Sequence, residues 1–231
     1  MAVIRFSRAD ALVSMIHFHA LLAQSCNGRY RSVVHGAFVT HHNDTDGFSV
    51  DHPARMLMPD TITLDDGRTV PFRPVQPDDA RRLQQLHLSH SARTLYQRFF
   101  GYYPELSDAQ ASRFATVDGH DRLAMVALDP EDSDKLIGVA RLDRDPGTTS
   151  AEYAAVVTDA WQGMGVGHGL TVSLLKAAVE VGITHVYALV LSGNQPMLAL
   201  LKGLGLPWRT SMGNDYERVE IELDDTRGDI S

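Results

Sequence analysis

The sequence predicts an α/β or α+β fold, with one mixed sheet that has helices on both faces. Short β-branched runs alternate with apolar patterns of helical spacing from residue 61 onward, and no internal repeat is present. A glycine-rich segment follows one strand-like run directly and opens a helix-like one. At 231 residues, the chain is long enough for one large domain or for one domain with an extension.

The first 58 residues are the least regular part of the chain. Ser7 is a candidate cap for a helix over residues 8–24, after which the periodicity is lost. We expect residues 1–58 to form a partly helical N-terminal extension that either docks on the rest of the chain or is disordered. His17 and His19 would lie on different faces of the helix, so we expect no metal site there.

From residue 59 the pattern becomes regular, and we expect one domain over residues 59–224. Asp66-Gly67 predicts the turn of a hairpin, and Ser107 predicts the start of a short helix. The elements expected in the first half are strands 61–64 and 69–72, helices 80–87, 89–100 and 107–114, and strands 122–128 and 136–142.

The second half of this domain is expected to begin with a strand over residues 152–157. A helix running to residue 181 follows the glycine-rich segment. Then come a strand 186–191, a helix that ends at Gly203, and two last strands, 208–212 and 216–223. Residues 225–231 form a charged tail.

The glycine-rich segment has the chemistry of an anion site. It reads Gln162-Gly163-Met164-Gly165-Val166-Gly167-His168. Glycines allow a tight turn and a close approach of the backbone, and the N–H groups of a first helical turn point at one spot. A diphosphate would suit such a cradle. The spacing matches neither a dinucleotide-binding fingerprint nor a P-loop.

The arrangement Gln-x-x-Gly-x-Gly, between a strand and a helix, resembles the acetyl-coenzyme A loop of the GNAT acetyltransferase superfamily. That resemblance implies a twisted, mostly antiparallel sheet of about seven strands with helices on both faces. Further motifs resemble the catalytic domain of bacterial Pat-type protein lysine acetyltransferases. They are residues 89–101, Val117-Asp118, 138–141, Ala151-Glu152 and 161–163.

The resemblance implies acetyl-CoA as cosubstrate and assigns residues to it. Backbone N–H groups of residues 163–168 would bind the diphosphate, and Gln162 would shape the turn. The pantetheine arm would lie against the main chain of Ala155, Val156 and Val157. Asn194 matches an asparagine that contacts CoA, although Asn is also a good helix cap.

The resemblance to the Pat-type enzymes, whose Ala-Glu strand motif supplies the base, implies that Glu152 is the general base. A lysine amine has a pKa of about 10.4, so it arrives protonated and must lose a proton before it attacks. The alternative for Glu152 is an ordinary ion-paired glutamate on a strand. Many GNAT enzymes place a tyrosine acid seven residues after the asparagine, where this chain has Leu201. Tyr153 and Tyr216 are weaker candidates for that acid.

Three histidines are tempting as bases: His120, His168 and His185. A helix N-terminus disfavours a charged histidine, so we interpret His168 as part of the loop. We interpret the other two as turn residues.

Composition limits the classes of partner. A net charge of −8 argues against a nucleic-acid partner. With Cys26 as its one cysteine, the chain forms no internal disulfide, and no apolar run is long enough to span a bilayer. We therefore expect a cytoplasmic enzyme that binds no membrane.

The expected partner is a protein that presents the target lysine, with an acyl-CoA synthetase as the candidate. A GNAT enzyme for a small-molecule amine and a non-catalytic acyl-CoA-binding regulator are the alternatives.

Overall fold

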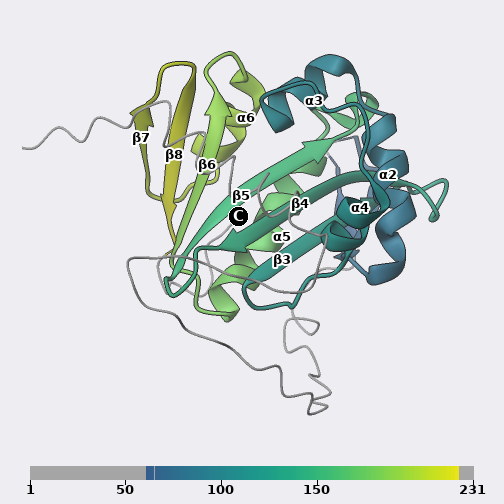
Figure 1. Cartoon of the computed structure of the whole chain (residues 1–231), viewed down its shortest axis with the longest axis horizontal. Helices are drawn as coiled ribbons and strands as arrows, with labels where there is room; N and C mark the ends of the chain where they lie inside the picture. Colours follow the sequence, from purple (N-terminus) through teal and green to yellow (C-terminus); the bar gives the residue numbers. More distant parts are fainter. Residues whose placement is uncertain (1–60, 65, 224–231) are drawn as a thin grey trace, which may run out of the picture. The chain divides into compact units, whose positions relative to one another are not determined.

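The computed structural model describes residues 61–64 and 66–223, all within one compact unit, Ala54–Ser231 (Figure 1). The expectations for residues 1–58 and 225–231 lie outside the described residues.

One eight-stranded sheet forms the centre of the described unit. Its strands lie in the order β1-β2-β3-β4-β5-β6-β8-β7. The strands are β1 Thr61–Thr63, β2 Thr69–Pro74, β3 Arg122–Leu128, β4 Leu136–Arg144, β5 Ser150–Val157, β6 His185–Leu191, β7 Trp208–Met212 and β8 Tyr216–Glu222. All neighbours pair antiparallel except β5 and β6. The prediction of a mixed, mostly antiparallel sheet is confirmed. The sheet has the eight strands expected from the sequence pattern, where the resemblance implied about seven.

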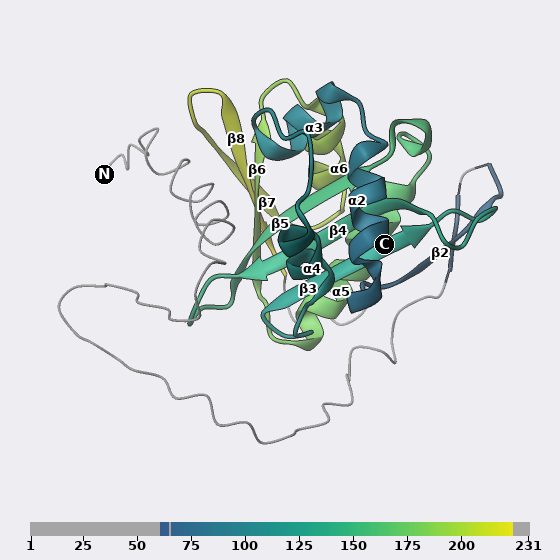
Figure 2. The ribbon, with the colours of Figure 1, turned by 45° about the vertical axis from the view of Figure 1, so that its right-hand side comes forward.

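Helices cover both faces of this sheet, as predicted. They are α2 Ala80–Leu88, α3 Ala92–Phe99, α4 Asp108–Ala115, α5 Val166–Glu180 and α6 Gln195–Lys202. Figures 1 and 2 show α2 and α4 on one face of the central strands and α5 on the other. The alternation of side chains along β5 fits this arrangement. Tyr153 and Ala155 join the core on the α5 face, whereas Ala154 and Val156 face α2 and α3.

The helix ends follow from local chemistry. The Ser91 side chain accepts the Thr94 N–H and caps α3, and Ser107 and Gln110 form a capping box at α4. Phe100, with φ of 58°, ends α3. The expected helix 89–100 is therefore shorter at both ends, because Ser91 is its cap and Phe100 leaves the helical conformation.

The pairing of β5 with β6 is unusually short. It joins Ser150 to His185, Ala151 to Val186, and Glu152 to Tyr187, with no further position in register. On its other side, β5 pairs with β4 as far as Val157. Within the described residues, the second half of β5 therefore lacks a strand partner on the β6 side. The sheet splits there, directly beyond Glu152.

The longest helix in the described part of the chain is α5, with 15 residues. At 1.5 Å per residue it is about 22 Å long, shorter than the ~30 Å hydrocarbon core of a bilayer. No described helix is thus long and apolar enough to cross a membrane.

Candidate active site

The glycine-rich loop lies between β5 and α5 and has free backbone donors. Gly163 and Gly165 have φ of 73° and 90°, a conformation in which glycine is strongly favoured. The Gly169 N–H bonds to the Gly165 carbonyl at 2.9 Å, which begins the helical ladder. Among the described residues, no acceptor is found for the backbone N–H groups of residues 163–168. These groups can therefore receive an anion.

Gln162 fixes the base of this loop. Its Nε2 donates to the Val157 carbonyl at 2.9 Å and to Asp159 Oδ1 at 3.2 Å. A Cβ built on Gly163 meets nothing within 4 Å, so the outer side of the loop is open. A Cβ on Gly167 would approach Leu200 of α6 at 3.1 Å, because α6 packs closely there. An open cradle of free N–H groups fits a diphosphate.

Asp159 joins the loop region to α3. It begins η3, the short 3-10 turn Asp159–Trp161. Its carboxylate accepts the Ser91 N–H at 2.9 Å and the Thr94 hydroxyl at 2.5 Å. These bonds hold the pKa of Asp159 below its usual value, the Thr94 bond being the largest cause. The carboxylate therefore stays ionised at the start of α3.

The other residues assigned to CoA lie around the split in the sheet. Ala155, Val156 and Val157 belong to the part of β5 that lacks a partner on the β6 side. Asn194 follows β6, and its Oδ1 accepts the Met197 N–H at 3.4 Å as the cap of α6. The capping alternative for Asn194 is thus realised, and this bond leaves its side-chain amide group available for other contacts.

Glu152 lies at the closed end of the split. It is half-buried and pairs in register with Asp143 of β4 and Tyr187 of β6. Its side chain emerges on the same face as Ala154 and Val156, because alternate residues of a strand share a face. Val157 is five positions farther along the strand, a distance of about 17 Å. A long extended ligand could therefore reach from the loop to this carboxylate.

The charge of Glu152 acts on groups from two neighbouring elements. Burial lowers the pKa of Arg98 on α3, and the charges of Glu152 and Asp143 oppose that change. Burial raises the pKa of Tyr187, and the charges of Glu152 and Asp145 raise it further. The Tyr187 hydroxyl donates to Asp145 at 3.0 Å. The proton of Tyr187 is therefore held firmly.

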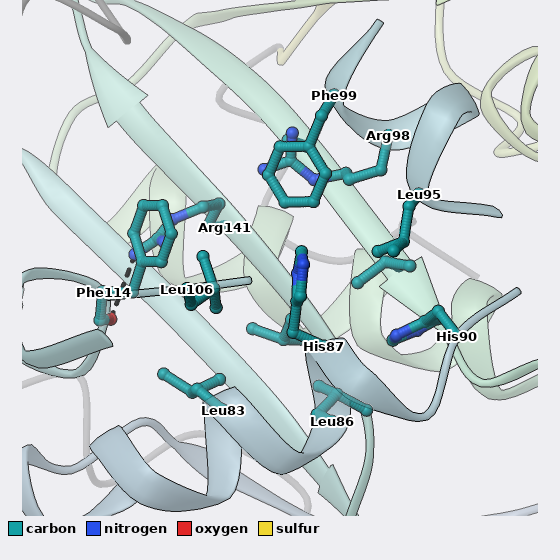
Figure 3. Close-up of a pocket in the computed structure, with 13 residues that line it drawn as sticks. Leu83, Leu86, His87, His90, Leu95, Arg98, Phe99, Leu106, Phe114 and Arg141 are labelled. Carbon is teal, nitrogen blue, oxygen red and sulfur yellow. Dashed lines mark hydrogen bonds between the residues drawn. The ribbon is translucent and has the colours of Figure 1, made fainter. Parts of the chain in front are cut away.

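An apolar pocket lies on the Glu152 face, between α2, α3 and the central strands (Figure 3). Its cavity measures about 50 Å³. Figure 3 shows His87 projecting from α2 into it, and Arg141 lying against Phe114. Burial lowers the pKa of His87 and of His90, and it lowers the pKa of Arg141 to about 10. Both imidazoles are therefore neutral near pH 7.

The family was established by comparison with known proteins. A model of the acetyltransferase (GNAT) domain matches residues 70–207. The chain belongs to the GNAT acetyltransferase family. A GNAT acetyltransferase uses acetyl-CoA, and the open loop described above fits its diphosphate. Among the described residues, no group of three or more His, Cys, Asp or Glu side chains could hold a metal ion.

Individual relatives of this GNAT domain were also found. An acetyltransferase of Pseudomonas aeruginosa is 31% identical over 144 residues, which is 62% of this chain and 77% of that protein. Acetyltransferase Pat of Mycolicibacterium smegmatis is 31% identical over 179 residues, 75% of this chain and 52% of Pat. This chain thus spans about half the length of Pat. The crystal structure of the GNAT domain of S. lividans PAT superposes with a TM-score of 0.65 at 32% identity, covering 71% of this chain and 96% of that one.

The position where the resemblance to GNAT enzymes would place a tyrosine acid holds a leucine, which has no proton to donate. Leu201 is 1% exposed and lies in the core. Tyr153 lies on the α5 face, opposite Glu152, where its hydroxyl bonds to Thr171 at 2.6 Å. Burial raises the pKa of Tyr153 to about 12. Neither side chain can donate a proton beside Glu152. Tyr216, on β8, is half-buried.

The three histidines weighed above as bases are all exposed. His168 lies in the first turn of α5, as expected. His185 begins β6, and its Nδ1 lies 2.9 Å from the Thr184 hydroxyl. His120 contacts Asp121 in the turn before β3. These surface positions agree with the interpretation of the three histidines as loop and turn residues rather than as bases.

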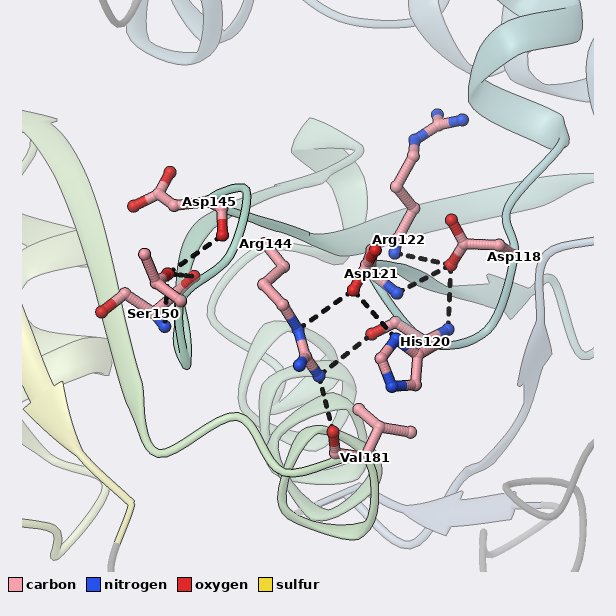
Figure 4. A network of polar contacts seen from close by, with 9 residues as sticks. Asp118, His120, Asp121, Arg122, Arg144, Asp145, Ser150 and Val181 are labelled. Carbon is pink, nitrogen blue, oxygen red and sulfur yellow. Dashed lines mark hydrogen bonds and ion pairs between the residues drawn. The ribbon is translucent and has the colours of Figure 1, made fainter. Parts of the chain in front are cut away.

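A polar network stabilises the strand ends near Glu152 (Figure 4). Asp118 Oδ1 accepts three backbone N–H groups, those of residues 120, 121 and 122. Burial opposes ionisation of Asp118, but these bonds outweigh it and lower its pKa. Arg144 donates to the Val181 carbonyl at 2.6 Å and pairs with Asp121 at 3.3 Å. Because Arg144 is opposite Ala151 in the sheet, this network holds the start of β5.

Three residues near the site were not predicted to act there: Arg98, Asp159 and Arg68. Arg98 lies within residues 89–101, a segment that resembles Pat-type enzymes. The motif was noted in the sequence, but it gave no role to Arg98. Asp159 stands three residues before Gln162, and its partners lie more than 60 residues earlier. Arg68 lies in the β1–β2 turn and reaches the loop only through the fold.

Proposed function

We propose that this GNAT enzyme transfers an acetyl group from acetyl-CoA to the side-chain amine of a lysine in a protein substrate. The observation that supports this best is the placement of Glu152. It is half-buried at the closed end of the β5–β6 split, one strand length from a loop of free N–H groups. The similarity to Pat and to the S. lividans PAT domain supports the choice of a lysine acceptor. An acyl-CoA synthetase is the candidate substrate.

The proposed reaction is a direct transfer in a ternary complex. Glu152 removes a proton from the lysine ammonium, directly or through one water, and frees the lone pair on nitrogen. That nitrogen attacks the thioester carbonyl carbon, and the carbonyl oxygen becomes an oxyanion beside a backbone N–H near Val157. As the oxyanion returns to a carbonyl, the C–S bond breaks and the new C–N bond is kept. The amide nitrogen gives its second proton to water or to the departing thiolate. The thiolate departs as such or takes a proton from water, because Leu201 has none to give.

The test is an acetylation assay with isotopically labelled acetyl-CoA. Purified acetyl-CoA synthetase and a panel of small amines are offered separately to the wild type and to the Glu152→Gln variant. We expect mass spectrometry to find the label on a lysine of the protein, and only with the wild type. Label on a small amine alone would indicate the other acceptor class. Tight binding of acetyl-CoA with no labelled product would indicate a non-catalytic regulator.

A further inference from the structure

Arg68 extends from the β1–β2 turn to the glycine-rich loop. Its Nη2 lies 3.0 Å from the Met164 sulfur, and its guanidinium carbon lies 4.5 Å from the centroid of the Trp161 ring. Trp161 lies two residues before Gly163 and Met164 directly after it, and a Cβ built on Gly163 meets nothing within 4 Å. Arg68 thus places a permanent positive charge at the rim of the loop.

The hairpin that holds Arg68 packs on the loop and on the start of α5. A Cβ built on Gly165 would lie 3.8 Å from Leu64 Cδ2, and one built on Gly169 would lie 1.9 Å from Ile62 Cδ1. Leu64 is buried at 4% exposure. Arg68 is therefore held near the loop by packing of its own hairpin, independently of its contact with Met164.

The loop by itself offers only neutral donors. A diphosphate brings negative charge to a chain whose net charge is −8, so a nearby cation should matter for binding. Arg68 is paired with Asp66 through Nη2 at 2.7 Å and Nε at 2.8 Å, and both side chains are nearly half-exposed. Such an exposed pair is worth little in water. A phosphate, with its greater charge and its fit to the guanidinium fork, can replace the carboxylate at small cost.

We propose that Arg68 contacts the diphosphate of coenzyme A and exchanges its pairing with Asp66 for phosphate oxygens. The contact would add a charge-assisted bond to those of the loop. The inference depends on coenzyme binding at this loop and is independent of the acceptor. It can therefore succeed even if the lysine substrate proposed above is wrong.

The test is isothermal titration of CoA and of dephospho-CoA, which lacks the 3′-phosphate, into the full-length protein without any acceptor. For Arg68→Ala we expect about tenfold weaker binding of both ligands, the equivalent of one charge-assisted hydrogen bond. We expect Arg68→Lys to lie between that variant and the wild type. Binding to Arg68→Ala should also depend less on salt concentration.

Two further variants separate this role from a structural one. Asp66→Asn keeps the side-chain oxygen that accepts the Arg68 N–H but loses the ion pair, so we expect it to bind CoA at least as tightly as the wild type. If Arg68 served only to hold the hairpin, Asp66→Asn would weaken binding as Arg68→Ala does. Arg209→Ala removes another exposed, ion-paired arginine, on β7, and should change nothing.

Three outcomes would overturn the proposal. In the first, Arg68→Ala binds both ligands as the wild type does. In the second, it loses affinity for CoA alone, which would place the contact on the 3′-phosphate. In the third, Asp66→Asn weakens binding to the same degree. Melting temperatures of the unliganded variants serve as the check on folding.

Discussion

The carboxylate of Asp159 accepts the backbone N–H of Ser91 at 2.9 Å, across 68 positions of sequence. Asp159 lies directly before the glycine-rich loop, and Ser91 caps the helix α3. Farther along α3, Arg98 feels the charge of Glu152. The same short helix is thus fixed to the loop at its start and lies near the expected base toward its end. We therefore expect a coupling, in which a change in the position of the loop alters the electrostatic surroundings of Glu152.

Replacing Asp159 by Ala should weaken the attachment of the glycine-rich loop to the start of α3. We expect a free energy of unfolding lower by about 1 kcal/mol, as for loss of a helix cap, and a several-fold higher KM for acetyl-CoA. Asp108→Ala is the matched control, because Asp108 is an exposed carboxylate that accepts from Gln84 at the start of α4. It should lower the melting temperature without raising KM. Equal effects of both variants on KM would contradict the coupling.

Replacing Glu152 by Gln should remove most of the turnover. General-base catalysis is typically worth 10²–10⁴-fold in rate, so we expect kcat to fall by about two to four orders of magnitude. The affinity for acetyl-CoA, measured by calorimetry, should stay unchanged because the loop is untouched. Glu180→Gln, at the exposed end of α5, is the control. Turnover at the wild-type rate in Glu152→Gln would exclude this base.

Asp79 should contribute to the dependence of the free energy of unfolding on pH in the acid range. It is fully buried, and Arg73 holds it through two bonds of 2.6 and 2.8 Å. Burial opposes its ionisation, but bonds from Arg73, the Gln76 N–H and Arg82 outweigh it and lower its pKa. Because the folded-state pKa is the lower one, this stabilisation is complete above the unfolded value of about 3.9. It is lost as the pH falls through the folded-state pKa.

The variant Asp79→Ala tests that assignment. Removing one partner of a buried pair typically costs about 3–5 kcal/mol, which we expect in urea unfolding at pH 7. The stability of the variant should also fall less steeply than that of the wild type below pH 4. Asp134→Ala removes an 84% exposed partner of Arg82 and should cost far less. If the free energy of unfolding fell equally steeply with pH below pH 4 in the wild type and in Asp79→Ala, the prediction would be wrong.

A larger residue at position 169 should lower the stability of the protein while Ile62 is present. Alanine normally stabilises a helix interior by about 0.5–1 kcal/mol relative to glycine. Here its Cβ would lie 1.9 Å from Ile62 Cδ1 and 2.9 Å from Phe72 Cε2. We expect Gly169→Ala to lower the stability by about 1–3 kcal/mol in thermal unfolding.

A second substitution makes this prediction specific. Ile62→Val removes the Cδ1 atom that the added Cβ at position 169 would meet, so it should recover part of the loss caused by Gly169→Ala. The double variant should therefore be more stable than the sum of the two single effects. Strict additivity would show that the contact with Ile62 is not the cause.

The sequence predicted the elements well because each has a strong local signal. Ser107 caps a short helix as expected, and the glycine-rich turn after β5 opens α5 as expected. The class of sheet followed from these elements and their order. The placement of Glu152 on a strand before the loop was also visible in the sequence.

The remaining features depend on contacts between distant parts of the chain. Nothing near Glu152 in sequence shows that β5 and β6 pair at three positions only, because register depends on how whole strands pack. The bonds from Asp159 to α3 and the reach of Arg68 to Met164 join residues 65 to 96 positions apart. Local patterns carry no information on such pairs.

The short pairing of β5 with β6 has a consequence for the stability of the protein when no ligand is bound. Backbone groups along the open half of β5 must be satisfied by water when no ligand lies there. A ligand with its own amide groups would take the place of that water and act as a missing neighbour. Above its Kd, each tenfold rise in free ligand would then add about 1.4 kcal/mol of stability. Resistance to heat and proteolysis would rise and fall with the supply of the acyl donor.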